Sequence, residues 1–217
     1  MNTLSAIGSF LVVATTLMVA PGPDTALVLR ASVVHGKRHA FATVLGISSG
    51  AATWGISAAL GISALVTASE VAYNTLRIAG AAYLVWMGVS MLWKTLRRVT
   101  ADNSGEETDW STAVTGAETP MRAWRRGITT NLLNPKVGVF YVAMLPQFVP
   151  DGASHLAMGL LLSLIHVLLG VLWFGLLIQA TDLARKWLQR RSVQLGMDRA
   201  TGAVLVCFGL LLGLSSS

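Results

Sequence analysis

Residues 20–24 read Ala-Pro-Gly-Pro-Asp and interrupt an apolar run that extends from about residue 4 to residue 34. Proline has no backbone donor and its ring clashes with the preceding helical turn, so two prolines around one glycine predict a helix break. In lipid the freed backbone groups need another partner, which favours a ligand site over the alternative of a simple kink. The predicted break consists of Pro21, Gly22 and Pro23.

A second break is predicted at residues 131–136, which read Asn-Leu-Leu-Asn-Pro-Lys. Pro135 here precedes Lys136 as Pro23 precedes Asp24, and both charged residues lie inside apolar segments. A charged side chain at the bilayer centre costs roughly 2.5–3.5 kcal/mol, so such residues usually serve a substrate or ion path. Asp24 and Lys136 are therefore the leading candidates to bind substrate and protons. A buried ion pair that only joins the two segments is the alternative.

Long apolar runs dominate the chain, since 53% of its residues are hydrophobic and only 12% are charged. Runs of about twenty apolar residues suit helices that cross a hydrocarbon core about 30 Å thick, so the composition predicts an all-α membrane protein. We expect six transmembrane helices, of which the first and the fourth are broken at the proline motifs. The six segments cover approximately residues 5–34, 41–67, 71–93, 123–149, 155–181 and 200–214.

Basic residues are concentrated in the loops that follow the first, third and fifth segments, beginning with Lys37 and Arg38. The inside-positive rule places these loops in the cytoplasm and both termini outside. The same rule accounts for the net charge of +6, which therefore does not indicate a nucleic-acid partner.

The two breaks suggest two related halves within a single integrated membrane domain. Residues 1–99 are predicted to form the first three-helix repeat, residues 100–119 a cytoplasmic linker, and residues 120–217 the second repeat. Each half has an odd number of spans, so the halves enter the membrane from opposite sides and form an inverted repeat, with the binding site at their interface. The polar linker is interpreted as a plain connector, and a regulatory role is the alternative.

Further polar residues follow the second break. Asn131, Asn134 and Gln147 are candidate substrate ligands because an amide side chain both donates and accepts. Asn131 has the alternative role of capping freed backbone groups. His166 is a candidate proton relay, or else a core histidine bonded to a neighbouring helix. The single cysteine, Cys207, forms no disulfide or cysteine-pair metal site within the chain, and we expect no metal and no cofactor.

Several of these motifs together resemble the lysine exporter (LysE/RhtB) family of bacterial amino-acid efflux transporters. The resemblance covers nearly the whole chain. It implies export of an amino acid or a close derivative across the inner membrane, driven by proton exchange, at a site formed by the two broken helices. It also implies, by analogy, that homodimers can form. The motifs are residues 21–24 (PGPD), 35–38 (HGKR), 46 and 50 (both Gly), 80–84 (GAAYL), 131–136 (NLLNPK) and 146–148 (PQF).

A lysine-like substrate would need a further carboxylate inside the membrane, and Asp24 is the only acidic residue in the predicted spans. The sequence therefore favours a neutral substrate such as threonine, homoserine or leucine, with protons and membrane lipid as the other partners. We expect Asp24 to bind the proton, and Lys136 to neutralise a carboxylate or to gate by pairing with Asp24. The rival functions are carriage of another small solute or a metal cation, a passive channel, and an intramembrane hydrolase. The hydrolase would need a second catalytic group beside Asp24, so the chain is not expected to be an enzyme.

Overall fold

The computed structural model describes residues 2–20, 22–100, 119–150, 152–181 and 190–214, and every regular element in these ranges is a helix. The all-α prediction is therefore confirmed for the described residues. Pro21 and most of the predicted linker at residues 100–119 lie outside the described part of the chain.

Among the described residues, four helices belong to the first half of the chain, and four more, with two irregular turns between them, belong to the second half. They are α1 (Thr3–Val19), α2 (Pro23–His35), α3 (Lys37–Ala68), α4 (Glu70–Thr100), α5 (Pro120–Leu132), α6 (Pro135–Val139), the π-helical turn η1 (Phe140–Met144), the 3-10 turn η2 (Leu145–Phe148), α7 (His155–Gln179) and α9 (Arg191–Leu214).

Within the described residues, two helices are long and apolar enough to cross a membrane unaided, over Lys37–Gly61 of α3 and His155–Gln179 of α7. The pair α1 and α2 qualifies as a third span when taken together, with a bend of 55° between the two helices. Helix α9 begins earlier than the apolar segment predicted at residues 200–214, because the polar residues before it are helical as well. Six spans remain a prediction.

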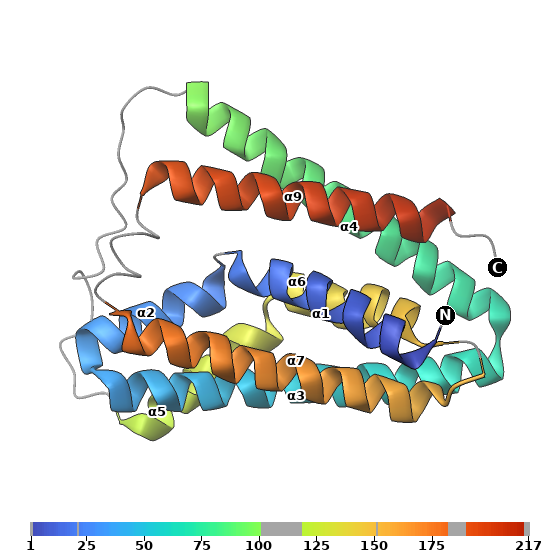
Figure 1. The fold of residues 1–217 in the computed structure, drawn as a ribbon, viewed down its shortest axis with the longest axis horizontal. Coiled ribbons are helices and arrows are strands. Elements are labelled where there is room, and N and C mark those ends of the chain that lie inside the picture. Colours follow the sequence, from blue (N-terminus) through green and yellow to red (C-terminus); the bar gives the residue numbers. More distant parts are fainter. Residues whose placement is uncertain (1, 21, 101–118, 151, 182–189, 215–217) are drawn as a thin grey trace.

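Helices α4 and α9 lie side by side on one side of the molecule, and α1, α2, α3, α5 and α7 pack together on the other (Figure 1). Close approach of small residues stabilises these contacts, since lipid offers no hydrophobic driving force between helices. A Cβ atom on Gly88 of α4 would lie 2.6 Å from the carbonyl oxygen of Gly202 of α9. A Cβ on Gly127 of α5 would lie 2.3 Å from the carbonyl oxygen of Thr43 of α3. Both contacts require glycine.

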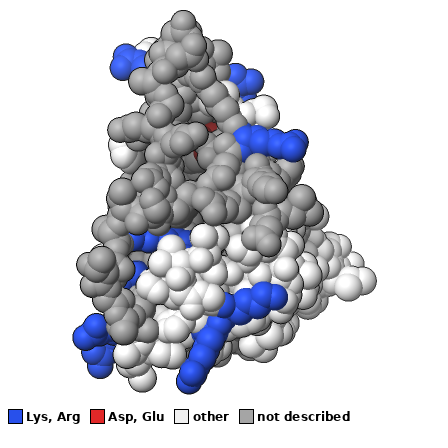
Figure 2. All heavy atoms as spheres, turned by 90° about the vertical axis from the view of Figure 1, so that its left-hand side faces the viewer, with Lys and Arg blue, Asp and Glu red and all other residues white. Residues whose placement is uncertain are grey.

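The first residue of α1 and the last of α9 lie at the same end of the molecule, whereas α2 ends and α9 begins at the opposite end (Figure 1). Figure 2 shows that opposite end, where Lys and Arg side chains project from the described surface. This distribution is the one that the inside-positive rule requires of a cytoplasmic face.

Candidate functional site

The first helix break lies between α1 and α2. Helix α1 ends at Val19, and its cap residue Ala20 is extended, with φ −62° and ψ 121°. Gly22 caps α2, and Pro23 occupies the first helical position, where its missing N–H group is not needed. Asp24 follows in the first turn of α2, where a carboxylate is favoured by the positive end of the helix dipole.

The second break lies between α5 and α6. The side chain of Asn134 caps α6 by accepting a hydrogen bond from the Lys136 backbone N–H at 3.1 Å. Pro135 occupies the first position of α6, as Pro23 does in α2. The helix then continues irregularly through the turns η1 and η2, with Pro146 inside η2. The chain after the second break is thus less regular than the single half-helix that the sequence predicts, and a proline inside it explains part of the difference.

Asn131 and Asp24 connect the two breaks directly. The Asn131 side-chain N–H donates to Oδ2 of Asp24 at 2.8 Å. Asp24 is only 9% exposed and Asn131 only 2%. The Asn134 side chain interacts electrostatically with the same carboxylate. Oδ1 of Asp24 and Oδ1 of Asn131 are buried and have no hydrogen-bond partner among the described residues. Oδ1 of Asn131 faces Gly50 of α3, so the unused acceptor toward a guest is Oδ1 of Asp24.

Lys136 connects the second break to the end of α1. Its Nζ donates to the carbonyl oxygen of Ala20 at 3.2 Å. This carbonyl belongs to the last turn of α1, where carbonyl groups lack helical partners and carry a partial negative charge. Lys136 interacts with the Asp24 carboxylate at longer range, and also with Asp198 of α9. The Lys136 ammonium therefore hydrogen-bonds the Ala20 carbonyl, and its interaction with the Asp24 carboxylate is only electrostatic.

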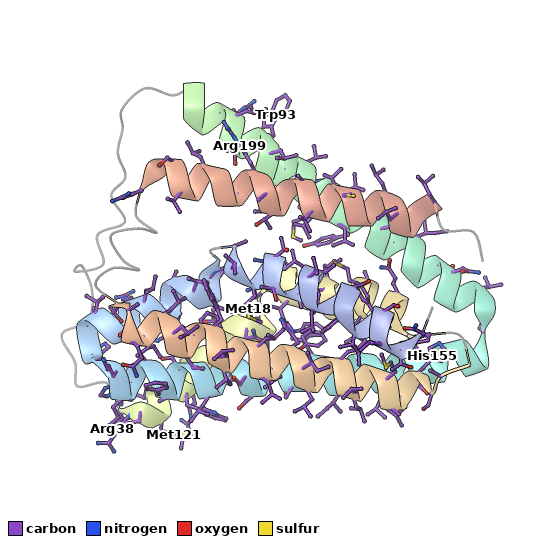
Figure 3. All side chains as sticks on the ribbon, viewed as in Figure 1. Met18, Arg38, Trp93, Met121, His155 and Arg199 are labelled. Carbon is purple, nitrogen blue, oxygen red and sulfur yellow. The ribbon has the colours of Figure 1, made fainter. Side chains whose placement is uncertain are left out.

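These residues surround one cavity of about 80 Å³, which is large enough for several water molecules. Met18, one of its lining residues, lies along the long axis between Arg38 at one end of the molecule and His155 at the other (Figure 3). The polar residues that line the cavity are Asp24, Asn131, Asn134, Lys136 and His166, and the apolar ones include Leu17, Met18, Ile47 and Phe174.

His166 of α7 contacts two aromatic residues of the segment that follows the second break. Its Nδ1 lies 2.8 Å from the hydroxyl of Tyr141, and its ring centroid lies 4.7 Å from that of Phe140. Tyr141 and Phe140 both belong to the π-helical turn η1, and such turns are frequent at functional sites. His166 is thus bonded to a neighbouring element and also lines the cavity, so the two interpretations of this residue are compatible.

Gln147 does not join these residues. Its side-chain N–H donates to the carbonyl oxygen of Ala143 at 2.7 Å, within its own segment. It is not among the described residues that line the cavity.

Gly50, one of the glycines that carry the family resemblance, lies directly behind Asn131. A Cβ atom on Gly50 would lie 2.8 Å from Oδ1 of Asn131. The absence of a side chain on α3 therefore allows Asn131 of α5 to keep its position against Asp24. Tyr141 and Asp198 were missed as well. A tyrosine within an apolar run and an acid before a predicted span were the only signals, and neither indicates a partner.

The chain is similar to known membrane proteins over nearly its whole length. The sequence model of the LysE type translocator family matches residues 15–216. Uncharacterized membrane protein YrhP of Bacillus subtilis is 31% identical over 211 residues, covering 95% of this chain and 98% of the relative. A leucine efflux protein of Enterobacter sp. is 28% identical, covering 85% of this chain and 83% of the relative. A homoserine/homoserine lactone efflux protein of Salmonella typhimurium is 27% identical, covering 94% of each chain. No solved structure gives a significant match.

Proposed function

Because the chain belongs to the LysE type translocator family, we propose that it exports a neutral amino acid or a close derivative, such as leucine, threonine or homoserine, in exchange for protons. The resemblance to the lysine exporter family is confirmed by this membership, and the family consists of translocators and not enzymes. Two relatives are named for efflux of leucine and of homoserine or its lactone, which supports an amino acid with an uncharged side chain.

The observation that carries this proposal is the meeting of a carboxylate and an ammonium, one from each helix break, at one buried cavity. A zwitterionic amino acid supplies one charge of each sign, so both of its charges can be paired away from water. Oδ1 of Asp24 accepts from the substrate ammonium, and Nζ of Lys136 donates to the substrate carboxylate. The substrate side chain lies toward Leu17, Met18 and Phe174.

Asp24 couples this binding to protons. A buried carboxylate needs a proton or a cation as its partner, and Oδ1 accommodates either a proton or the substrate ammonium. Arrival of a proton therefore favours release of the amino acid, and binding of the amino acid requires that the proton leave. His166, which lines the same cavity, is the proposed relay for this proton.

The proposed setting is the bacterial inner membrane, crossed six times with both termini outside. The two three-helix repeats, residues 1–99 and 120–217, each contribute one broken helix and one charged residue to the site, with residues 100–119 as the cytoplasmic linker. The shared end of the molecule at which α1 begins and α9 ends supports this topology, as do the basic side chains at the opposite end.

The proposal is tested by counterflow in proteoliposomes loaded with one amino acid at a time, for the standard amino acids and homoserine, with and without an imposed pH gradient. We expect saturable counterflow of leucine, threonine or homoserine, no counterflow of lysine, and net export that accelerates when protons flow in the opposite direction. Liposomes without protein provide the background. Absence of saturable counterflow for every compound would reject the amino-acid substrate, and net export indifferent to the pH gradient would reject proton coupling.

A further inference from the structure

A second cavity of about 610 Å³, larger than the first and more open to the surroundings, lies between α1 and α9. Its volume is within the range of pockets that hold small organic ligands. The lining residues are Leu11, Val12, Thr15, Thr16, Val19, Ala20, Ala200 and Thr201.

Ala20 separates this cavity from the one that holds Asp24. Ala20 lines both cavities, and its carbonyl oxygen is the acceptor for Lys136. The partition between the two spaces is therefore the end of α1. There the Ala20 N–H donates to the Thr16 carbonyl within the helix, and the Ala20 carbonyl accepts from Lys136, the residue that we assign to the substrate carboxylate. Asp198 of α9 interacts electrostatically with the Lys136 ammonium. It precedes Thr201 by less than one helical turn, so Lys136 also interacts with the helix that forms the opposite wall of the second cavity.

Thr201 gives the second cavity a polar feature that the packing of α9 does not explain. Its side chain is only 1% exposed, and its Oγ1 has no hydrogen-bond partner among the described residues. Threonine hydroxyls in helices usually bond a carbonyl of the preceding turn, as Thr95 does here with Met91 at 2.8 Å. Buried hydroxyls are nearly always paired, so this unpaired hydroxyl beside the cavity has a free valence for a polar guest once the wall shifts.

We infer that the α1–α9 cavity is the exit route of the transported amino acid, with the Lys136–Ala20 hydrogen bond as its inner gate and Thr201 as a polar contact along it. The inference rests on the proposed function. In the predicted topology α1 begins at the outer face, so the stretch of α1 from Ala20 back to Leu11 leads from the break toward the outside. A substrate carboxylate binds the Lys136 ammonium more strongly than a neutral carbonyl does, because a hydrogen bond between two charged groups is the stronger one. Arrival of substrate thus releases Ala20 and opens the partition.

Cysteine accessibility tests the route. Cys207, the single native cysteine, is exposed and is replaced first by Cys207→Ser. Thr201→Cys is then introduced in that background, and Ala203→Cys, on an exposed part of α9, serves as the matched control. A membrane-impermeant cationic thiosulfonate is added from outside to oriented proteoliposomes, and labelling and leucine or homoserine efflux are both measured.

We expect Thr201→Cys to be labelled from outside, to be labelled more slowly when leucine or homoserine is present, and to lose efflux once labelled. Efflux by Ala203→Cys is expected to survive the reagent. Resistance of Thr201→Cys to the impermeant reagent, combined with reaction toward a lipid-soluble maleimide, would identify a crevice open to lipid and would overturn the route. Full efflux after complete labelling would overturn it as well. If Thr201→Cys fails to insert, Thr16→Cys on the facing wall is judged by the same two outcomes.

Failure of the route and failure of the proposed function are distinguishable. Efflux by the Cys207→Ser parent reports on the proposed function alone, whereas labelling of Thr201→Cys from outside reports on the route without requiring any transport. If the Cys207→Ser parent exports neither leucine nor homoserine, the proposed substrates are wrong. Labelling of Thr201→Cys would still show whether the cavity opens to the outside.

Discussion

At the scale of single residues, the two oxygens of the Asp24 carboxylate are not equivalent. Oδ2 accepts from Asn131 at 2.8 Å, while Oδ1 has no hydrogen-bond partner in the described structure. Asn131 thereby fixes the orientation of the carboxylate and leaves one oxygen for a guest. Lys136 completes the pair of charges from the other break, held on the Ala20 carbonyl.

We expect the substitution Asp24→Asn to abolish proton-driven efflux while leaving insertion into the membrane intact. The amide has the same shape but provides neither a negative charge for the substrate ammonium nor a site for a proton. A hydrogen bond to a charged group contributes about 1.5–3 kcal/mol, so apparent affinity is expected to fall at least tenfold. Net efflux and counterflow in proteoliposomes measure both effects.

The control for this substitution is Glu70→Gln, the same change of an acid to its amide at the first residue of α4. It is expected to export normally. Efflux by Asp24→Asn at the parent rate and with the parent dependence on the pH gradient would show that this carboxylate does not couple transport to protons.

At the scale of helices, the site depends on how closely α3 approaches α5. Gly46 and Gly50 of α3 face α5, where a Cβ on Gly46 would lie 2.1 Å from the Trp124 carbonyl oxygen. Gly50 meets the side chain of Asn131 in the same way. Glycines four residues apart let two helices approach closely. Here this approach also positions a residue of the site, because it determines how far Asn131 reaches toward Asp24.

Gly50→Ala is expected to weaken substrate binding without unfolding the protein. The added methyl group would lie 2.8 Å from Oδ1 of Asn131 and push that side chain away from Asp24. Gly61→Ala in the same helix, where a Cβ meets nothing within 4 Å, is the matched control. In a helix interior alanine is favoured over glycine by about 0.5–1 kcal/mol, so the control is expected to retain or gain thermal stability. Counterflow affinity and the melting temperature in detergent are measured for both variants, and equal affinities would contradict the positioning role of Gly50.

At the scale of the whole molecule, the two charged breaks belong to opposite halves of the chain and meet between α1, α2, α5 and α6. In the proposed topology both ends of the chain are outside and the basic end of the molecule is cytoplasmic. This orientation determines the direction of the exit route, because it decides which end of α1 faces the outside.

Fusions to alkaline phosphatase test this orientation. The enzyme needs disulfides, which form outside the cytoplasm and not within it. Fusion after Leu214 at the end of α9 is expected to be active, whereas fusion after His35 or Thr100 is expected to be inactive. Expression of each fusion, measured by immunoblot, is the control. The reverse pattern of activity would invert the topology and turn the proposed exit into an entrance.

The amino-acid sequence alone determined the helical class, the positions of the two breaks and the identity of the charged residues. Each of these follows from local chemistry: proline cannot continue a helix, apolar runs of spanning length favour lipid, and a charge among apolar residues is conspicuous wherever the chain folds. Asp24 and Lys136 could therefore be selected without knowledge of what surrounds them.

The tertiary structure decided the partners. Asn131 holds Asp24, Lys136 rests on the Ala20 carbonyl, and Tyr141 holds His166, whereas Gln147 bonds within its own segment. No local pattern predicts these contacts, because they depend on how helices distant in sequence are rotated and shifted against one another. That arrangement is set by packing across the whole molecule, including close approaches at glycines that carry no side chain to signal their role.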